Sequence, residues 1–138
     1  MLGLVLAVAL STQCTDLCSP AAILYYADLL QHAGYGQLPV EHAAFLIRES
    51  DGSLTTEPWR DSGHRRVRFR GAIPPNTIAV VHTHPKDAPL PSVHDRLEAR
   101  KIDLPVLVVT PAGVAAAFPD GRLEHLVDGS RFRAIAVN

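Results

Sequence analysis

The chain has 138 residues, of which 47% are hydrophobic and 20% charged, the balance of an ordinary globular domain rather than of a disordered chain. This length predicts one domain, large enough to fold without a disulfide or a structural metal. The formal net charge of −1 excludes a general electrostatic attraction to nucleic acid or anionic lipid, so we predict no nucleic-acid partner. No run reaches the roughly 20 apolar residues of a membrane-spanning helix, which predicts no transmembrane anchor in the mature protein.

The N-terminal segment resembles an export signal. The uncharged run 1–10 (MLGLVLAVAL) is apolar, a polar stretch follows it, and small residues near 19–21 offer a cleavage site. We therefore predict a leader over residues 1–19 and export to the periplasm or the cell exterior. The positively charged n-region is missing, and the alternative is an apolar segment packed on the core of a cytoplasmic protein.

The two cysteines, Cys14 and Cys18, lie within this predicted leader. They form either a disulfide in an oxidising compartment or part of a segment that is removed. The rest of the chain contains no cysteine, which excludes thiol catalysis and a cysteine-rich zinc finger there.

Residues 20–138 are predicted to form a single α/β (α+β) domain in which helices pack on a mixed sheet. Apolar residues at helical spacing predict helices over 20–33 and 92–102. Apolar and alternating runs predict strands over 40–48, 53–57, 64–70, 77–81, 104–110, 114–118, 122–127 and, in the tail, 132–137. The dipeptide Asp51-Gly52 predicts a tight hairpin between the first two strands.

The segment 64–70 (HRRVRFR) places arginines on one side of its predicted strand. An anion-binding or nucleic-acid-binding stripe is one interpretation of this pattern. We favour the other, a half-buried strand with a charged solvent face, because no aromatic residue lies on the arginine face and the chain has no net positive charge.

The most informative segment runs from His82 to Asp95. Side chains two residues apart on a strand point to the same face, so His82 and His84 can converge on one ion where the strand ends before Pro85. Asp95 would join them from the first turn of the next helix. Two imidazoles, one carboxylate and one open position form a common catalytic zinc site. The sequence therefore predicts one zinc ion per chain, bound by His82, His84 and Asp95.

Asp95 also has an alternative role. Ser92-x-x-Asp95 has the spacing of a helix capping box, with Asp in place of Glu or Gln. A carboxylate bonded to the backbone is expected to ligate a metal poorly, so the two roles compete. If capping prevails, Asp87 and Glu98 are the alternative ligands.

The pattern H-T-H-P-x6-S-x-x-D at residues 82–95 resembles the H-x-H-x7-S-x-x-D signature of the JAMM (MPN-type) zinc metalloproteases. That family also places a glutamate on an upstream strand, followed by apolar residues, and the segment 40–47 (VEHAAFLI), with Glu41, looks like that strand. The resemblance covers about residues 41–127. It implies a curved mixed sheet flanked by helices, in a JAMM or cytidine-deaminase-like architecture. It also implies zinc on His82, His84 and Asp95 with water as the fourth ligand, Glu41 as the general base, and Ser92 as the hydrogen-bond donor to the oxyanion.

Two departures from the family limit what the resemblance predicts. Ala44 stands where the family often has glycine, and the insertions with which eukaryotic members grip ubiquitin are not evident. Glu49, at the far end of the same predicted strand, is the rival for the base. We expect a hydrolase that uses zinc-activated water on a peptide or isopeptide-like amide bond, with a peptide or protein as substrate. The alternatives are a non-catalytic binding or scaffold module with this fold, and a hydrolase of a small amide.

Overall fold

The protein is described here by a computed structural model that covers residue 14, residues 16–65, residue 67 and residues 71–136. The helices are α1 (Pro20–His32), the 3₁₀ turn η2 (Gly34–Gly36), α2 (Val93–Ile102) and α3 (Ser130–Ala136). The strands are β1 (Ala43–Arg48), β2 (Leu54–Pro58), β3 (Thr77–Thr83), β4 (Val106–Thr110), β5 (Gly113–Ala117) and β6 (Leu123–Asp128).

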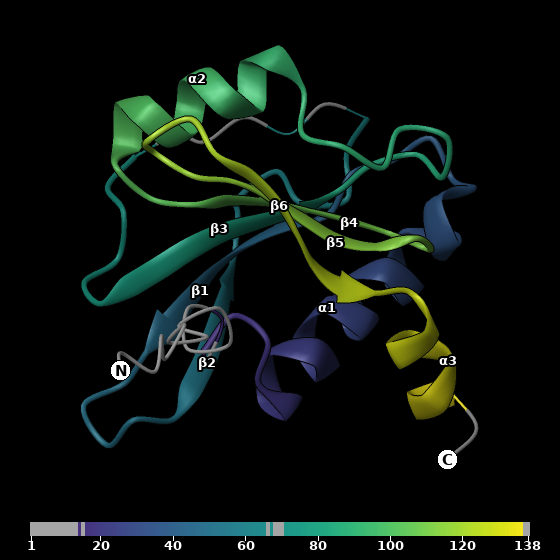
Figure 1. Ribbon diagram of the computed structural model, residues 1–138, viewed down its shortest axis with the longest axis horizontal. Helices are drawn as coiled ribbons and strands as arrows, with labels where there is room; N and C mark the ends of the chain where they lie inside the picture. The colour runs from purple at the N-terminus through teal and green to yellow at the C-terminus, as the bar shows by residue number, and fades with distance from the viewer. Residues whose placement is uncertain (1–13, 15, 66, 68–70, 137–138) are drawn as a thin grey trace, which may run out of the picture.

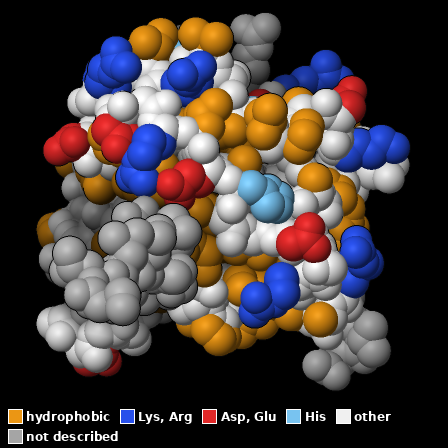
Figure 2. Space-filling view, viewed as in Figure 1, with side chains coloured by type: hydrophobic (Ala, Val, Ile, Leu, Met, Phe, Trp, Pro, Cys, Tyr) orange, Lys and Arg blue, Asp and Glu red, His pale blue; other side chains and the backbone are white. Residues whose placement is uncertain are grey.

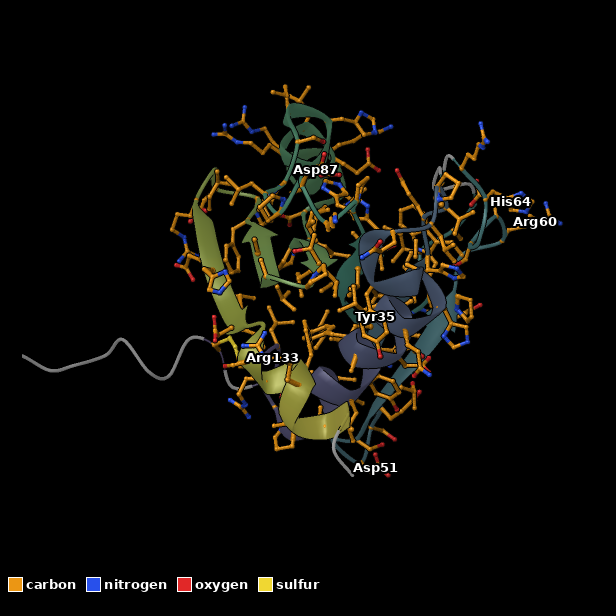
Figure 3. The ribbon with its side chains drawn as sticks, turned by 90° about the vertical axis from the view of Figure 1, so that its right-hand side faces the viewer. Tyr35, Asp51, Arg60, His64, Asp87 and Arg133 are labelled. Carbon is orange, nitrogen blue, oxygen red and sulfur yellow. A yellow bond between two sulfur atoms is a disulfide. The ribbon has the colours of Figure 1, made fainter. Side chains whose placement is uncertain are left out.

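The strands form one six-stranded sheet in the order β2-β1-β3-β4-β5-β6. β3 and β4 are parallel, and every other pair of neighbours is antiparallel. Helices α1 and α3 lie against one face of the sheet and α2 against the other (Figure 1). The prediction of an α/β domain with a mixed sheet and packed helices is confirmed, and the tight hairpin at Asp51-Gly52 joins β1 to β2 (Figure 3).

Each face of the sheet has its own apolar core. Ala79 and Val81 of β3 join the core under α1, which is centred on the fully buried Tyr26. Val80, between them in the sequence, joins the smaller core under α2 with Phe45 of β1. This alternation follows from the two-residue period of a strand, and it places His82 on the α2 face together with Val80.

Helix α1 begins where the sequence predicts. The Ser19 hydroxyl accepts a hydrogen bond from the Ala22 N–H at 3.2 Å, and Pro20 occupies the first turn, where its missing N–H costs nothing. Just before the helix, Cys14 and Cys18 form a disulfide, and Leu17 is buried in the core. Residues 1–13 and 15 lie outside the described residues, so the leader over 1–19 stays a prediction.

The predicted tail strand is wrong, because residues 130–136 form helix α3. A short apolar run does not distinguish a strand from a helix by periodicity alone. The Asp128 carboxylate accepts a hydrogen bond from the Ser130 N–H at 3.3 Å and starts the helical turn. Phe132 and Ile135, three residues apart, then face the core together, as helical spacing allows.

The predicted strand 64–70 lies largely outside the described residues, which exclude 66 and 68–70. Within it, His64 forms an isolated bridge with Glu41. His64, and Arg60 in the segment that follows β2, project from the edge of the molecule (Figure 3). Over α2 and β6, acidic and basic side chains are interspersed with apolar ones (Figure 2). No helix in the described part of the chain is long and apolar enough to span a membrane.

Candidate metal centre

Strand β3 brings His82 and His84 to one side of the sheet. His82 pairs with Ala43 of β1 and with Val108 of β4, so its backbone is held on both sides. His84 follows the end of β3, and its N–H still donates to the Val109 carbonyl at 3.1 Å. The two imidazole rings meet edge to face with centroids 4.7 Å apart, and each side chain is 12% exposed.

Helix α2 supplies the third side chain, Asp95, from its first turn. The Asp95 carboxylate is buried, with Oδ1 2.9 Å from His82 Nε2 and Oδ2 3.2 Å from His84 Nε2. One ligand atom from each of the three side chains lies within 4.8 Å of the others. Two nitrogens and one carboxylate oxygen at this separation could hold one metal ion.

Asp95 caps helix α2 and also directs an oxygen at His82. Asp95 Oδ2 accepts a hydrogen bond from the Ser92 N–H at 2.8 Å, and the Asp95 N–H donates to Ser92 Oγ at 3.1 Å, so the capping box is complete. The box uses only one carboxylate oxygen, and Oδ1 faces His82. The cap fixes the orientation of the carboxylate and leaves Oδ1 directed at His82, so the geometry allows capping and ligation together; ligation by Asp95 stays a prediction.

His82 supports the fit of a metal. Its buried Nε2 makes no well-aligned hydrogen bond within the described chain, although Asp95 Oδ1 lies only 2.9 Å away. The Nε2–Oδ1 contact is short, but its direction is poor for an N–H donor. A buried polar atom left in this state costs on the order of 1–3 kcal/mol. A cation between nitrogen and oxygen satisfies both.

His84 is oriented from its other side. Its Nδ1 lies 3.0 Å from the Ala88 carbonyl oxygen, a contact that assigns the ring proton to Nδ1. The Nε2 lone pair then faces Asp95. Metal-binding histidines are commonly held in this way, with the second ring nitrogen donating to a backbone carbonyl.

Asp95 and His84 shift each other's pKa. Burial raises the pKa of the Asp95 carboxyl, but the close imidazoles of His82 and His84 and the Ser92 N–H outweigh burial and hold it well below its usual range. Burial lowers the pKa of His84, yet Asp95, the Ala88 carbonyl and Glu41 together leave it raised above the ordinary value. Asp95 is thus ionised, the state that a metal ligand requires.

Glu41 reaches the same site from the neighbouring strand. It lies two residues before Ala43, the partner of His82, so the antiparallel register places it opposite His84. β1 begins at Ala43, which means that Glu41 precedes the strand rather than lying within it. Its backbone is held by a hydrogen bond from its N–H to the His64 carbonyl at 2.8 Å and by one from the Gly63 N–H at 2.7 Å.

All five side chains predicted from the sequence border one cavity of about 250 Å³. Its lining residues are Glu41, Val67, His82, His84, Ser92, His94 and Asp95. The rival candidates lie elsewhere. Glu49 is exposed at the other end of β1, where it accepts a hydrogen bond from the Thr55 hydroxyl at 2.6 Å. Asp87 is exposed on the loop before α2 (Figure 3).

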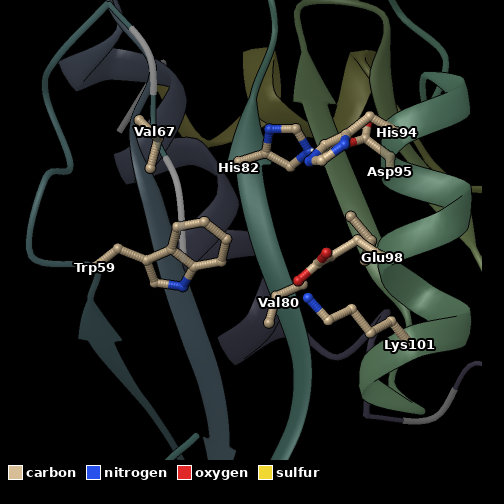
Figure 4. Close-up of a pocket in the computed structure, with 9 residues that line it drawn as sticks. Trp59, Val67, Val80, His82, His94, Asp95, Glu98 and Lys101 are labelled. Atoms are coloured by element: carbon tan, nitrogen blue, oxygen red, sulfur yellow. The ribbon is translucent and has the colours of Figure 1, made fainter. Parts of the chain in front are cut away.

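A second cavity of about 290 Å³ shares Val67, His82, His94 and Asp95 with the first and extends along β3 and α2 (Figure 4). Its remaining lining residues are Trp59, Val80, Glu98, Lys101 and Val106. Glu98, the other alternative ligand, therefore lies beside the metal group rather than within it. From the sequence, a packing role is the more common one for Trp59 and an exposed helix position for His94, and Lys101, which carries no motif, gives no signal.

No family model matches the chain, and no curated protein matches it. The resemblance to the JAMM family accordingly depends on the residues themselves, Glu41 and the segment 82–95.

Proposed function

We propose that the protein is a JAMM-type zinc metallohydrolase that cleaves a peptide or isopeptide-like amide bond. The observation that carries the proposal is the convergence of His82, His84 and Asp95 with Glu41 and Ser92 on one cavity. These residues come from three separate parts of the chain, just before β1, at the end of β3 and at the start of α2, and a structural role for each would not require them to meet at the same space.

The ligand set favours zinc. Zinc accepts imidazole nitrogen and carboxylate oxygen together, whereas calcium and magnesium prefer oxygen ligands alone. A bound zinc ion polarises a carbonyl group and lowers the pKa of a coordinated water to about 7. Three protein ligands leave one position open, which is the pattern of catalytic rather than structural zinc sites.

Glu41 is proposed to handle the proton. Its carboxylate borders the cavity opposite His84 and contributes to the raised pKa of that histidine, so it lies within electrostatic reach of the metal group. In this role it accepts a proton from the attacking water and delivers it to the departing amine. A structural metal would have no use for a carboxylate at this position.

Ser92 is proposed to stabilise the negative charge that develops on the carbonyl oxygen of the substrate. Its Oγ accepts the Asp95 N–H, and a hydroxyl that accepts one hydrogen bond can still donate its own hydrogen. The capping box fixes this hydroxyl at the rim of the cavity, so little reorganisation is needed when the oxyanion forms.

The alternatives are a scaffold module of the same fold and a hydrolase of a small amide. Glu41 and Ser92 argue against the scaffold, because binding alone requires neither. A small amide would be enclosed by the first cavity alone. The second, contiguous cavity gives room for substrate beyond the scissile bond and favours a peptide.

A charge-removing variant tests the enzymatic proposal. The Glu41→Gln protein should retain zinc but lose hydrolysis of a peptide library by at least about 100-fold, the usual contribution of a general base. Glu49→Gln is the matched control, since it changes the same residue type on the opposite end of β1. Unchanged hydrolysis in the Glu41→Gln protein would refute the proposed role, as would an equal loss in both variants.

Export remains part of the proposal. The apolar run 1–10 and the Cys14–Cys18 disulfide support an oxidising compartment. Because Leu17 is buried and Ser19 caps α1, we propose that cleavage of the leader, predicted over residues 1–19, leaves the chain from Cys14 onward. Sequencing the N-terminus of the mature protein tests this, and an intact Met1 would contradict cleavage.

A further inference from the structure

The second cavity is a groove that begins at the metal group. Val80 of β3 and Val106 of β4 are partners in the parallel pair and line it, each only 2% exposed. Glu98 and Lys101 of α2 line one side, and Trp59 faces α2 from the other side of β3 (Figure 4). The groove therefore combines a buried apolar floor with a charged helix along one side.

Trp59 is held in place before any substrate arrives. Its ring packs against Phe45 with centroids 5.7 Å apart and the planes inclined by 42°. The backbone N–H of Trp59 donates to the Ala43 carbonyl at 2.9 Å, and the backbone carbonyl of Trp59 accepts the Ser62 N–H at 3.0 Å. A wall fixed in this way costs little ordering entropy on binding.

We propose that this groove is a specificity subsite for an apolar side chain, carried by the residue next to the scissile amide of an extended peptide substrate. The proposal depends on the proposed function for the position of the scissile bond. Val80 lies two residues before His82 on the same face of β3, which is about 6–7 Å along the strand. A carbonyl at the metal group therefore places the adjacent side chain of the substrate over Val80 and Trp59.

The size and charge of the groove set the kind of side chain that it takes. A cavity of 290 Å³ lies just below the range of about 300–1,000 Å³ that encloses a drug-sized ligand, so it accommodates one side chain rather than a folded domain. Glu98 and Lys101, three residues apart on α2, have opposite charges. A basic side chain directed at Glu98 would also meet Lys101, and an acidic one directed at Lys101 would meet Glu98. An apolar side chain meets neither penalty.

The chain provides its own reporter, because Trp59 is its one tryptophan. We would titrate the zinc-loaded Glu41→Gln protein, which cannot turn substrate over, with capped pentapeptides Gly-Gly-Xaa-Gly-Gly in which Xaa is Leu, Ala, Lys or Glu. Binding is followed by tryptophan emission. The leucine peptide should bind at least about tenfold more tightly than the alanine peptide, from the larger apolar area that it buries. The lysine and glutamate peptides should bind more weakly than the leucine peptide. Equal affinities, no binding up to millimolar peptide, or binding without a change in emission would each overturn the proposal.

A blocking variant locates the subsite. Glu98→Phe introduces a ring into the groove from α2, and Arg96→Phe introduces the same ring on an exposed position of that helix outside the groove. Made in the Glu41→Gln protein, Glu98→Phe should abolish the preference for leucine, whereas Arg96→Phe should retain it. Zinc content and melting temperature are measured on both to establish that each variant folds. If zinc binds and peptides are cleaved without a preference for leucine, this inference alone fails. If zinc does not bind, the proposed function itself fails.

Discussion

Asp95 offers a direct way to separate the metal site from the capping box, because its two carboxylate oxygens have different partners. An asparagine at this position keeps an oxygen that can accept the Ser92 N–H, now 2.8 Å from Oδ2, but presents an amide NH₂ to His82. An NH₂ group cannot ligate a cation. In contrast, Ser92→Ala removes the hydroxyl that accepts the Asp95 N–H and leaves all three predicted ligands in place.

The expected magnitudes differ enough to be measured. Zinc at 100 times its dissociation constant stabilises the folded protein by about 2.7 kcal/mol. For a chain of 138 residues the unfolding entropy is about 0.3 kcal/mol per kelvin, so this corresponds to a rise of about 9 °C in melting temperature. Loss of the serine cap costs about 1 kcal/mol, or about 3 °C.

The assay is thermal unfolding of the metal-free proteins, each with and without added zinc. The wild type should rise by about 9 °C with zinc. Ser92→Ala should melt a few degrees lower without metal and show the same rise. Asp95→Asn should also melt lower without metal, since it loses a charge buried beside two histidines, but zinc should leave its melting temperature unchanged. A full zinc response in Asp95→Asn, or its loss in Ser92→Ala alone, would refute the assignment of Asp95 as a ligand.

Three further predictions concern the histidine pair, the core and the sheet. His84→Ala should weaken zinc binding measured by calorimetry by at least about tenfold, whereas His32→Ala, an exposed histidine of α1, should not. Burial raises the pKa of Tyr26, so the neutral phenol stabilises the folded protein below pH about 10, and this stabilisation is lost as the pH rises above it. Tyr26→Phe should therefore flatten the alkaline fall of the unfolding free energy measured in urea titrations. An unchanged slope would contradict this. Gly113→Ala should cost more than about 1 kcal/mol in the same titrations, because φ is +130° there and the added Cβ would collide with the Val127 carbonyl oxygen.

Much of the architecture could be predicted because its signals are local. Ser19-Pro20 begins α1 and Ser92 begins α2 through side-chain caps that read directly from the sequence. The apolar runs of β3 and β4 predict buried strands, and this signal is also local. The tail failed because its few apolar residues fit either period, and only the packing of Phe132 against the core decides for α3.

In the candidate site, too, some positions follow from local sequence patterns and others only from the tertiary fold. Strand parity places His82 and His84 on one face, and helix spacing places Asp95 in the first turn of α2. The position of Glu41 opposite His84 depends on the pairing register of β1 with β3, which no local pattern encodes. The groove is less predictable still, because Trp59 and Lys101 meet across it only through the tertiary fold.

The central claim is that His82, His84 and Asp95 bind a zinc ion, and elemental analysis of the purified protein tests it most directly. We expect about one zinc per chain in the wild type and almost none in a His82→Ala/His84→Ala protein that remains folded by circular dichroism. A wild-type protein that takes up no zinc, or a double variant that retains it, would contradict the account.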